Sequence, residues 1–192
     1  MGIEPQDIQL VKDCLGGNSQ AEYALYKKYG PSTFGICRRY TRDAMEAEDL
    51  HQLGWIKTFD KLKDYRKEGP FGAWLRVLFV SVCLNAYQKK KNEWKWLTFN
   101  VDLFESQELS DLKSPSDFLE MEHLTNLISG LPEGARLVFN MYAIEGMNHA
   151  EIAMKLSISE ENSRQQLQRA RQKLKRQLVF QKQLADPNFK KI

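Results

Sequence analysis

The sequence predicts an all-α protein built from two small helical domains that a linker joins. Apolar residues recur at spacings of three and four along several stretches, whereas no alternating pattern long enough for a useful strand occurs. Charge is also divided along the chain: residues 1–91 carry a net +4, residues 92–126 a net −6 and residues 127–192 a net +5. Two basic blocks separated by an acidic one indicate two modules that bind a polyanion.

The first domain is expected over residues 1–91, where the apolar pattern predicts a series of helices. Ser19 to Glu22 has the form of a capping box, so a helix should begin there. Gly30-Pro31 should end that helix, because proline breaks a helix interior. Further helices are expected over about 32–41, from about 43 to 59 and, after a turn at 66–70, over 71–91.

The periodicity fades after residue 91, and an acidic linker is expected over 92–118. The second domain is expected over 119–180, followed by a tail over 181–192. Ser114-Pro115 offers an N-cap and a first-turn proline for a helix over about 116–130. Helices should follow over about 132–144, 149–156 and 160–180. Because only residues 157–159 separate the last two, they predict a helix-turn-helix, whose second helix can enter a major groove.

The second helix of this motif has two distinct faces. Leu167, Ala170, Leu174 and Leu178 form one apolar stripe that should be buried. The opposite stripe carries amides and guanidinium groups, which pair with base edges, and the flanks carry cations suited to phosphates. The alternative is a solvated amphipathic helix that packs only against its neighbours. The outward residues are Glu161, Asn162, Gln165, Arg169, Gln172 and Arg176, and the flanking cations are Arg164, Arg171, Lys173 and Lys175.

Composition excludes several other classes of protein. The chain has 192 residues, of which 42% are hydrophobic and 28% charged, as in soluble globular proteins. The best candidate for a membrane span, residues 77–84, is far shorter than the roughly 20 residues required, and the N-terminus lacks the pattern of a signal peptide. The three cysteines are odd in number and, like the histidines, far apart. We therefore expect a reduced, cytoplasmic protein without metal, cofactor or catalytic chemistry.

The motifs of both halves resemble those of bacterial RNA polymerase sigma factors. The first half carries the motifs of the first domain of that family, the second half those of its C-terminal domain, and the short layout is similar to the extracytoplasmic-function (ECF) type. The matching segments are Leu25–Tyr29, Ala47–Gln52 and Phe71–Leu75 in the first half, and Leu131–Asn140, Ile144–Gly146, His149–Ala153 and Arg169–Leu174 in the second.

The resemblance implies a role for each motif. The helix with the Glu-Asp-Leu-x-Gln pattern binds a coiled coil of the largest polymerase subunit in this family, which assigns core-polymerase binding to Glu48, Asp49, Gln52 and Trp55. The alternative for Trp55 is a place in the core. Capture of the melted −10 element is implied for Trp74, Arg76, Ser81, Asn85, Lys89, Lys90 and Lys91. Duplex reading of the −35 element is implied for Glu161, Asn162, Arg164, Gln165, Arg169, Arg171 and Lys173, in a domain that also touches the polymerase flap.

The sequence departs from the ECF pattern at a few positions that read DNA. Asn is common where this chain has Ser81, Asp where it has Asn85, and Gly-Thr where it has Glu161-Asn162. These changes fit either a different promoter sequence or a separate DNA-targeting partner protein. The function implied is an ECF sigma factor that binds core RNA polymerase and directs initiation at promoters. The alternative is a helix-turn-helix regulator that does not join polymerase, and the presence of an anti-sigma factor stays open.

Overall fold

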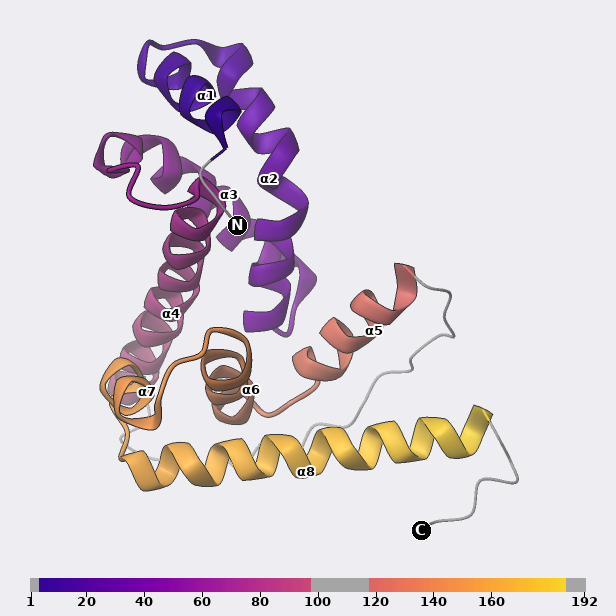
Figure 1. Cartoon of the computed structure of the whole chain (residues 1–192). Helices are drawn as coiled ribbons and strands as arrows, with labels where there is room; N and C mark the ends of the chain where they lie inside the picture. The colour runs from indigo at the N-terminus through magenta and orange to yellow at the C-terminus, as the bar shows by residue number, and fades with distance from the viewer. Residues whose placement is uncertain (1–3, 98–117, 186–192) are drawn as a thin grey trace. The chain divides into compact units, whose positions relative to one another are not determined.

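The computed structural model describes residues 4–97 and 118–185, and these residues form helices and the turns between them (Figure 1). The chain divides into two compact units, Met1–Val101 and Asp102–Ile192. The predicted all-α fold with two domains is therefore confirmed. Most of the expected linker, residues 98–117, and the end of the expected tail, residues 186–192, lie outside the described residues, as does the N-cap expected at Ser114.

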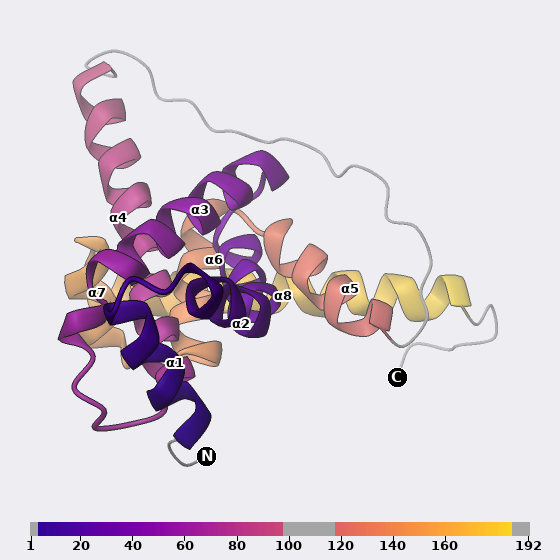
Figure 2. The same ribbon diagram turned by 90° about the horizontal axis from the view of Figure 1, so that it is seen from above.

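The first unit is a bundle around its longest helices. Its elements are α1 (Pro5–Leu15), α2 (Ser19–Tyr40), α3 (Ala44–Asp60), the 3₁₀ turn η1 (Leu62–Asp64) and α4 (Phe71–Leu97). Helix α2 packs against α1, α3 and α4, and α3 packs against α4. Leu25, Phe71, Leu75 and Phe79 are among its fully buried side chains. The last turns of α4 project beyond α1, α2 and α3 in both views (Figures 1 and 2).

Helix α2 runs without a break through Gly30 and Pro31, so the predicted stop there is wrong. The hydroxyl groups of Ser32 and Thr33 both donate to the Tyr29 carbonyl at 2.9 Å, and Thr33 also lies 3.0 Å from the Gly30 carbonyl. These bonds reinforce the turn that contains the proline, although the carbonyl to which Pro31 cannot donate is that of Lys27, four residues earlier. Proline inside a helix costs about 3 kcal/mol, and α2 tolerates it because three other helices pack along its length.

Other boundaries also differ from the sequence-based expectation. The N-cap of α2 is Asn18 rather than Ser19, and its side chain accepts a bond from the Gln20 amide at 2.9 Å. Helix α4 continues to Leu97, so the linker does not start at residue 92, and α8 continues to Ala185. No glycine or proline lies between residues 73 and 97 or between 160 and 185, which leaves both helices without a stop signal.

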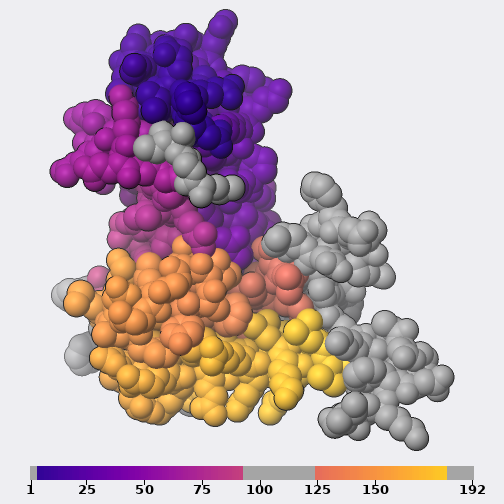
Figure 3. Space-filling model, viewed as in Figure 1, coloured from indigo at the N-terminus to yellow at the C-terminus, as the bar shows by residue number. Residues whose placement is uncertain are grey.

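The second unit contains α5 (Phe118–Ser129), α6 (Glu133–Phe139), the π-helical turn η2 (Asn140–Ile144), α7 (His149–Leu156) and α8 (Glu160–Ala185). Helix α8 packs against α6 and α7, and these three form a continuous surface in Figure 3. Leu131, Ala135 and Ala170 meet in the core, with Phe139 and Leu174 against them. Arg136 is buried beside this core and donates to the Ser129 carbonyl at 3.0 Å.

Candidate polymerase and DNA interfaces

Helix α3 presents the exposed carboxylates and amide that were expected to bind polymerase. Asp43 caps the start of the helix by accepting a bond from the Met45 amide at 3.1 Å. Glu48, Asp49 and Gln52 follow on the exposed side. Three apolar side chains that were not expected at this site lie on the same face: Met45, Leu53 and Ile56, which are 70%, 39% and 60% exposed. The face is therefore amphipathic, which suits a protein interface.

Trp55 does not belong to this exposed face, and its expected place beside the carboxylates is corrected. The side chain is only 4% exposed, and its Nε1 donates to Nε2 of His51 at 3.0 Å. Its indole ring lies 5.2 Å from the ring of Tyr26 and 5.9 Å from that of Phe79, between centroids. The buried residues of α3 recur at spacings of three and four: Ala47, Leu50, His51, Gly54, Trp55 and Thr58. Trp55 also follows Gln52 by three residues and Glu48 by seven, so spacing alone does not separate it from the exposed face.

His51 connects α3 to α2 inside this core. Its Nε2 lies 3.0 Å from the Thr33 hydroxyl as well as accepting from Trp55. Burial lowers the pKa of His51, and a hydrogen bond with the Gly30 backbone acts in the opposite direction. A neutral ring is what the indole N–H requires as its acceptor. This buried contact holds α3 in the orientation that exposes Asp49 and its neighbours.

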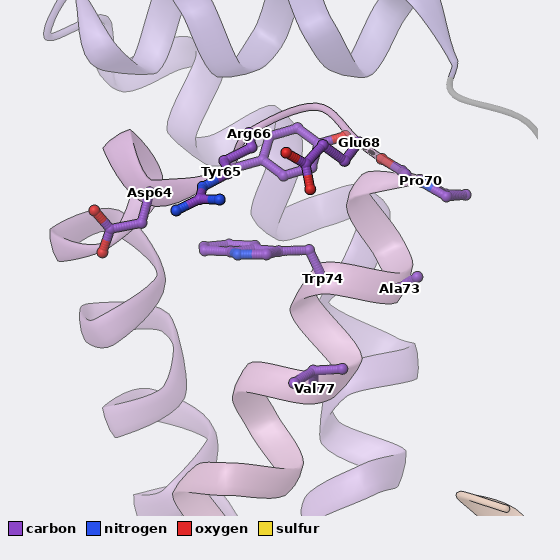
Figure 4. A pocket seen from close by; sticks show the side chains of 9 residues that line it. Asp64, Tyr65, Arg66, Glu68, Pro70, Ala73, Trp74 and Val77 are labelled. Atoms are coloured by element: carbon purple, nitrogen blue, oxygen red, sulfur yellow. Dashed lines mark hydrogen bonds between the residues drawn. The ribbon is translucent and has the colours of Figure 1, made fainter.

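Trp74 of α4 borders an open hollow of about 350 Å³, here called the loop hollow. Figure 4 shows the indole extending from α4 toward Asp64, with Arg66 on one side of the ring and Val77 on the other. The Tyr65 hydroxyl donates to the Gly69 carbonyl at 2.6 Å and ties the loop into a turn. The remaining residues that line the loop hollow are Glu68, Pro70 and Ala73, with Tyr65 and Gly69.

A second hollow of about 310 Å³, here called the lysine hollow, adjoins the first along α4. Its lining includes Trp74, Ser81 and Asn85, so the structure brings together three of the residues expected at the −10 element. Lys57 of α3, Lys61 between the two helices and Asp64 of η1 line it on one side, and Val77, Leu78 and Val82 line it from α4. Lys57, Lys61 and Asp64 were not expected at this site from the sequence.

The other residues expected at the −10 element lie apart from these hollows. Arg76 is exposed on α4 but lines neither hollow. Lys89 and Lys90 are exposed and Lys91 is half-buried, and Lys90 forms an ion pair with Glu46 of α3. At 1.5 Å per residue, the three lysines lie about 22 to 26 Å along α4 from Trp74.

The helix-turn-helix expected in the second unit consists of α7 and α8. Asn148 and Glu151 form a capping box at the start of α7, and Ser157 ends it in the left-handed conformation at φ 51°. Along α8, Leu167 and Ala170 are buried as expected and Leu174 is half-buried, but Leu178 is 41% exposed, so its expected burial is wrong. All the predicted outward residues are exposed: Glu161, Asn162, Gln165, Arg169, Gln172 and Arg176.

The flanks of α8 are held by local contacts. Arg164 pairs with Glu160 at 2.7 Å. The guanidinium of Arg171 lies 5.6 Å above the ring of Tyr142, which stacks on His149 with 4.7 Å between centroids. His149 Nδ1 in turn lies 2.9 Å from the buried Ser163 hydroxyl. Arg171 is therefore exposed at a fixed place on α8, whereas Lys173 is half-buried.

Comparison with known proteins matches both units. The family model for sigma-70 region 2 matches residues 25–93, and that for sigma-70 region 4 matches residues 121–174. RNA polymerase sigma-H factor of Pseudomonas aeruginosa is 26% identical over 186 residues, which are 93% of this chain and 96% of that protein. ECF RNA polymerase sigma factor SigM of Bacillus subtilis is 28% identical over 152 residues, covering 79% of this chain and 91% of the relative.

Among solved structures, CnrH in complex with the cytosolic domain of CnrY matches with a TM-score of 0.47 and 22% identity, over 90% of this chain and 97% of that one. The two matched regions include more than half of the chain and follow each other in the order of the family. The protein is thus a sigma factor, a class of non-enzymatic subunits that bind core RNA polymerase and promoter DNA. It belongs to the sigma-70 family and, within it, to the ECF type, and it directs RNA polymerase to promoters.

Family membership removes the alternative of a regulator that does not join polymerase. A separate DNA-targeting partner protein finds no support in the relatives and stays a prediction. Within residues 4–97 and 118–185, no helix is both long and apolar enough to cross a membrane. In the same part of the chain, no three His, Cys, Asp or Glu side chains are grouped as a metal site.

Proposed function

We propose that this ECF sigma factor divides promoter recognition among three surfaces. The exposed face of α3 binds core polymerase, the loop hollow with Trp74 holds an unstacked base of the −10 element, and the outward stripe of α8 reads the −35 element as duplex. Trp74 carries the proposal, since its ring borders an open hollow within the matched region 2. Aromatic rings beside cationic groups are the platforms on which proteins stack the bases of single strands.

The position of Trp74 supports this role because its ring is already held in place. Phe71 stacks on it with centroids 5.6 Å apart and 24° between planes, and Tyr65 packs at 5.7 Å. A preorganised ring loses little conformational entropy when a base stacks on it. Arg66 lies beside the ring in the same hollow (Figure 4). Its guanidinium can contact a phosphate or stack on a base.

The polymerase and −35 surfaces rest on exposure and charge. Glu48, Asp49 and Gln52 provide polar groups that fix register, and Met45 and Ile56 provide apolar area beside them. On α8, Gln165 and Arg169 have side chains able to pair with purine edges. The neighbouring cations, Arg164 and Arg171, are suited to phosphates that position the helix without specifying sequence.

An anti-sigma factor is proposed as a regulator of this protein. A similar sigma factor, RpoE of Bartonella quintana, was solved in complex with the anti-sigma factor NepR. That chain is 15% identical to this one, with a TM-score of 0.48 and with 82% of this chain and 96% of that chain covered. The amphipathic face of α3 would be a suitable target for such a protein. The protein is proposed to act in the cytoplasm, where core polymerase and promoter DNA are found.

The proposal is tested with the full chain bound to core polymerase and a promoter selected from a randomised library. Permanganate footprinting of melted thymines should show strand opening with the wild type and with Trp74→Tyr, which keeps a ring. Trp74→Ala should lose opening while it still binds core polymerase. Normal opening by Trp74→Ala would contradict base capture at this site.

A further inference from the structure

His51 is a buried side chain with polar partners on two different helices. It is 8% exposed, and its Nε2 accepts a hydrogen bond from the Trp55 indole, one turn further along α3, at 3.0 Å. The same nitrogen lies 3.0 Å from the Thr33 hydroxyl oxygen on α2. One ring nitrogen is therefore shared between a contact inside α3 and a contact that joins α3 to α2.

The two partners require opposite protonation states of Nε2. An indole N–H can only donate, so Nε2 must lack a proton to accept from Trp55, which assigns the proton of the neutral ring to Nδ1. The Thr33 hydroxyl has a single hydrogen, and the carbonyls of Tyr29 and Gly30 lie 2.9 and 3.0 Å from its oxygen. When that hydrogen is donated to a carbonyl, the Thr33 oxygen faces Nε2 as an acceptor. The neutral ring thus satisfies Trp55, whereas a protonated Nε2 satisfies Thr33 instead.

We propose that His51 is a proton-controlled switch that sets the affinity of α3 for core polymerase. Uptake of a proton from solvent turns Nε2 into a donor, so that its bond moves from Trp55 to Thr33. The indole N–H then loses this acceptor in a side chain that is only 4% exposed, which is unfavourable. The charged ring therefore favours a different placement of α3. This inference rests on the proposed function, because α3 carries the polymerase-binding residues Asp49 and Gln52.

The surroundings of the ring keep it neutral at neutral pH. Four aromatic rings face it, with centroids 5.4 to 6.4 Å away: Tyr26 and Phe34 of α2, Trp55 of α3 and Phe79 of α4. Tyr26 is the only one of the four that titrates, and a phenol carries no charge in acid that could balance an imidazolium. Burial lowers the pKa of His51, opposed in part by a hydrogen bond with the Gly30 backbone. The switch therefore operates below about pH 6.5, the ordinary pKa of histidine.

The switch itself is tested on the free full chain by NMR. The nitrogen-15 chemical shifts of a histidine ring report which nitrogen carries a proton, and the indole N–H resonance of Trp55 is assigned with Trp55→Phe. As the pH is lowered from about 7.5 to about 5, His51 should change from the Nδ1–H tautomer to the charged ring. The Trp55 indole resonance should move with the same midpoint. A His51 ring that stays neutral down to about pH 5, or a Trp55 resonance that does not follow it, overturns the switch.

The transfer of the bond is tested at its second partner. Thr33→Val removes the oxygen that accepts from the charged ring, and it should move the midpoint of the His51 titration to lower pH by about 0.4–1 pH unit, the equivalent of one hydrogen bond. Thr58→Val is the matched control, because Thr58 is also buried but bonds to the Gly54 carbonyl of its own helix at 2.8 Å. It should leave the midpoint unchanged. Equal midpoints for the two variants would contradict the transfer to Thr33.

Polymerase binding by the full chain is then measured at about pH 7.5 and about pH 5.5. His51→Gln keeps an amide oxygen that can accept from Trp55 but does not become charged in this range. On acidification, the wild type should lose about 5- to 150-fold in affinity for core polymerase relative to His51→Gln, the range for a buried donor that loses its partner. His123→Gln removes a histidine of α5 and should respond to pH as the wild type does.

The outcomes separate this inference from the proposed function. If His51 and Trp55 titrate together but the wild type and His51→Gln lose affinity equally, the regulation of polymerase binding is overturned while the docking of α3 stands. If Asp49→Lys/Gln52→Ala binds core polymerase as tightly as the wild type, the docking of α3 is wrong, and the regulation that rests on it is wrong as well.

Discussion

The carboxylate of Asp7 on α1 accepts a hydrogen bond from the hydroxyl of Tyr29 on α2. Asp7 is only 3% exposed, and its other oxygen accepts from Lys28 at 2.6 Å. The Tyr29 ring meets Phe71 edge-on with centroids 5.5 Å apart, and Phe71 in turn stacks on Trp74. A polar contact at the start of the chain is thereby connected, through two aromatic rings, to the wall of the loop hollow.

Asp7→Asn should therefore destabilise the first unit and weaken capture of the −10 strand. An amide can accept a bond from only one of the two donors at full strength, and hydrogen bonds to a charged group contribute about 1.5–3 kcal/mol. We expect the free energy of unfolding in urea to fall by about 1–3 kcal/mol. Gln9→Ala, an exposed position on the same helix, serves as the control and should change it by less than about 0.5 kcal/mol. Equal stability of the two variants would show that this contact is not what holds α1.

The same cluster predicts a loss of stability in alkali. Burial, followed by the hydrogen bond with Asp7, raises the pKa of Tyr29, and hydrogen bonds to Asp7 and Glu4 raise that of Lys28. In both cases the folded state favours the protonated side chain. The stabilisation is therefore fully present at a pH below the pKa of the group in the unfolded state, and it is lost as the pH rises through the pKa of the group in the folded state. Urea unfolding should give a free energy that declines above about pH 10. The decline should be smaller in Asp7→Asn, and parallel curves would contradict the assignment.

Gly54 is predicted to be intolerant of a side chain. A Cβ atom there would lie 2.3 Å from Cε1 of Phe79, at the crossing of α3 and α4. Overpacking of this kind costs about 1–3 kcal/mol, which exceeds the roughly 1 kcal/mol that alanine gains over glycine in a helix. Gly54→Ala should thus lower the urea midpoint. Gly35→Ala in α2, whose Cβ would meet only Arg39 at 3.7 Å, should keep or raise it, and the opposite order would contradict the close crossing.

The sequence predicts those features of the fold that depend on residues close together in the chain. The all-α class and the outward stripe of α8 follow from helical spacing, and the division into two domains follows from the charge blocks along the chain, and the structure agrees on all three. The course of α2 through Pro31 could not be predicted in the same way, because it depends on tertiary packing against α1, α3 and α4, which the local pattern around Pro31 does not contain. Helix α1 was not assigned, although Pro5 at its first turn and Gly16-Gly17 after its end are start and stop signals.

The candidate sites likewise divide into residues that the local sequence pattern predicts and residues that only tertiary packing brings to the site. Glu48, Asp49 and Gln52 are exposed as the pattern of α3 requires. The family resemblance assigns Trp55 to the same interface, with a place in the core as the alternative, and the structure shows that the core alternative holds, because the side chain is buried with Leu50 and His51. Lys57 and Lys61 could not be assigned to the neighbourhood of Trp74, since only the folding of α3 against α4 makes them line one hollow.

Core binding through α3 is tested by Asp49→Lys/Gln52→Ala. The change reverses a charge and removes an amide on the exposed face, so co-purification with core polymerase should fall greatly while helical content stays the same. Gln9→Ala/Asp13→Lys makes the same pair of changes on α1, where the two side chains bond to each other at 2.8 Å. That control should bind core polymerase as the wild type does. Equal recovery of both variants would mean that α3 is not the docking surface.

The start of α8 predicts weak selection of the −35 element. Glu161 is exposed there, and its carboxylate accepts from the Gln165 amide at 3.3 Å. A carboxylate that faces DNA repels phosphates unless a cytosine amino group meets it. The bond also engages Gln165, one of the side chains expected to read a base. The phosphate-facing cations remain exposed on the same helix, so binding should persist while selectivity is low.

Transcription from a randomised promoter library, with core polymerase and this factor alone, measures that selectivity. The wild type should enrich a −35 motif only weakly, because each missing base contact gives up about 1–3 kcal/mol of a margin of about 4–10 kcal/mol over random DNA. Glu161→Gln removes the charge but keeps a side chain that can bond to Gln165, and it should bind duplex DNA more tightly. Glu133→Gln, an exposed carboxylate on α6, should not. Strong enrichment of a two-part motif by the wild type would overturn the prediction, since Glu161 would then read its promoter rather than oppose it.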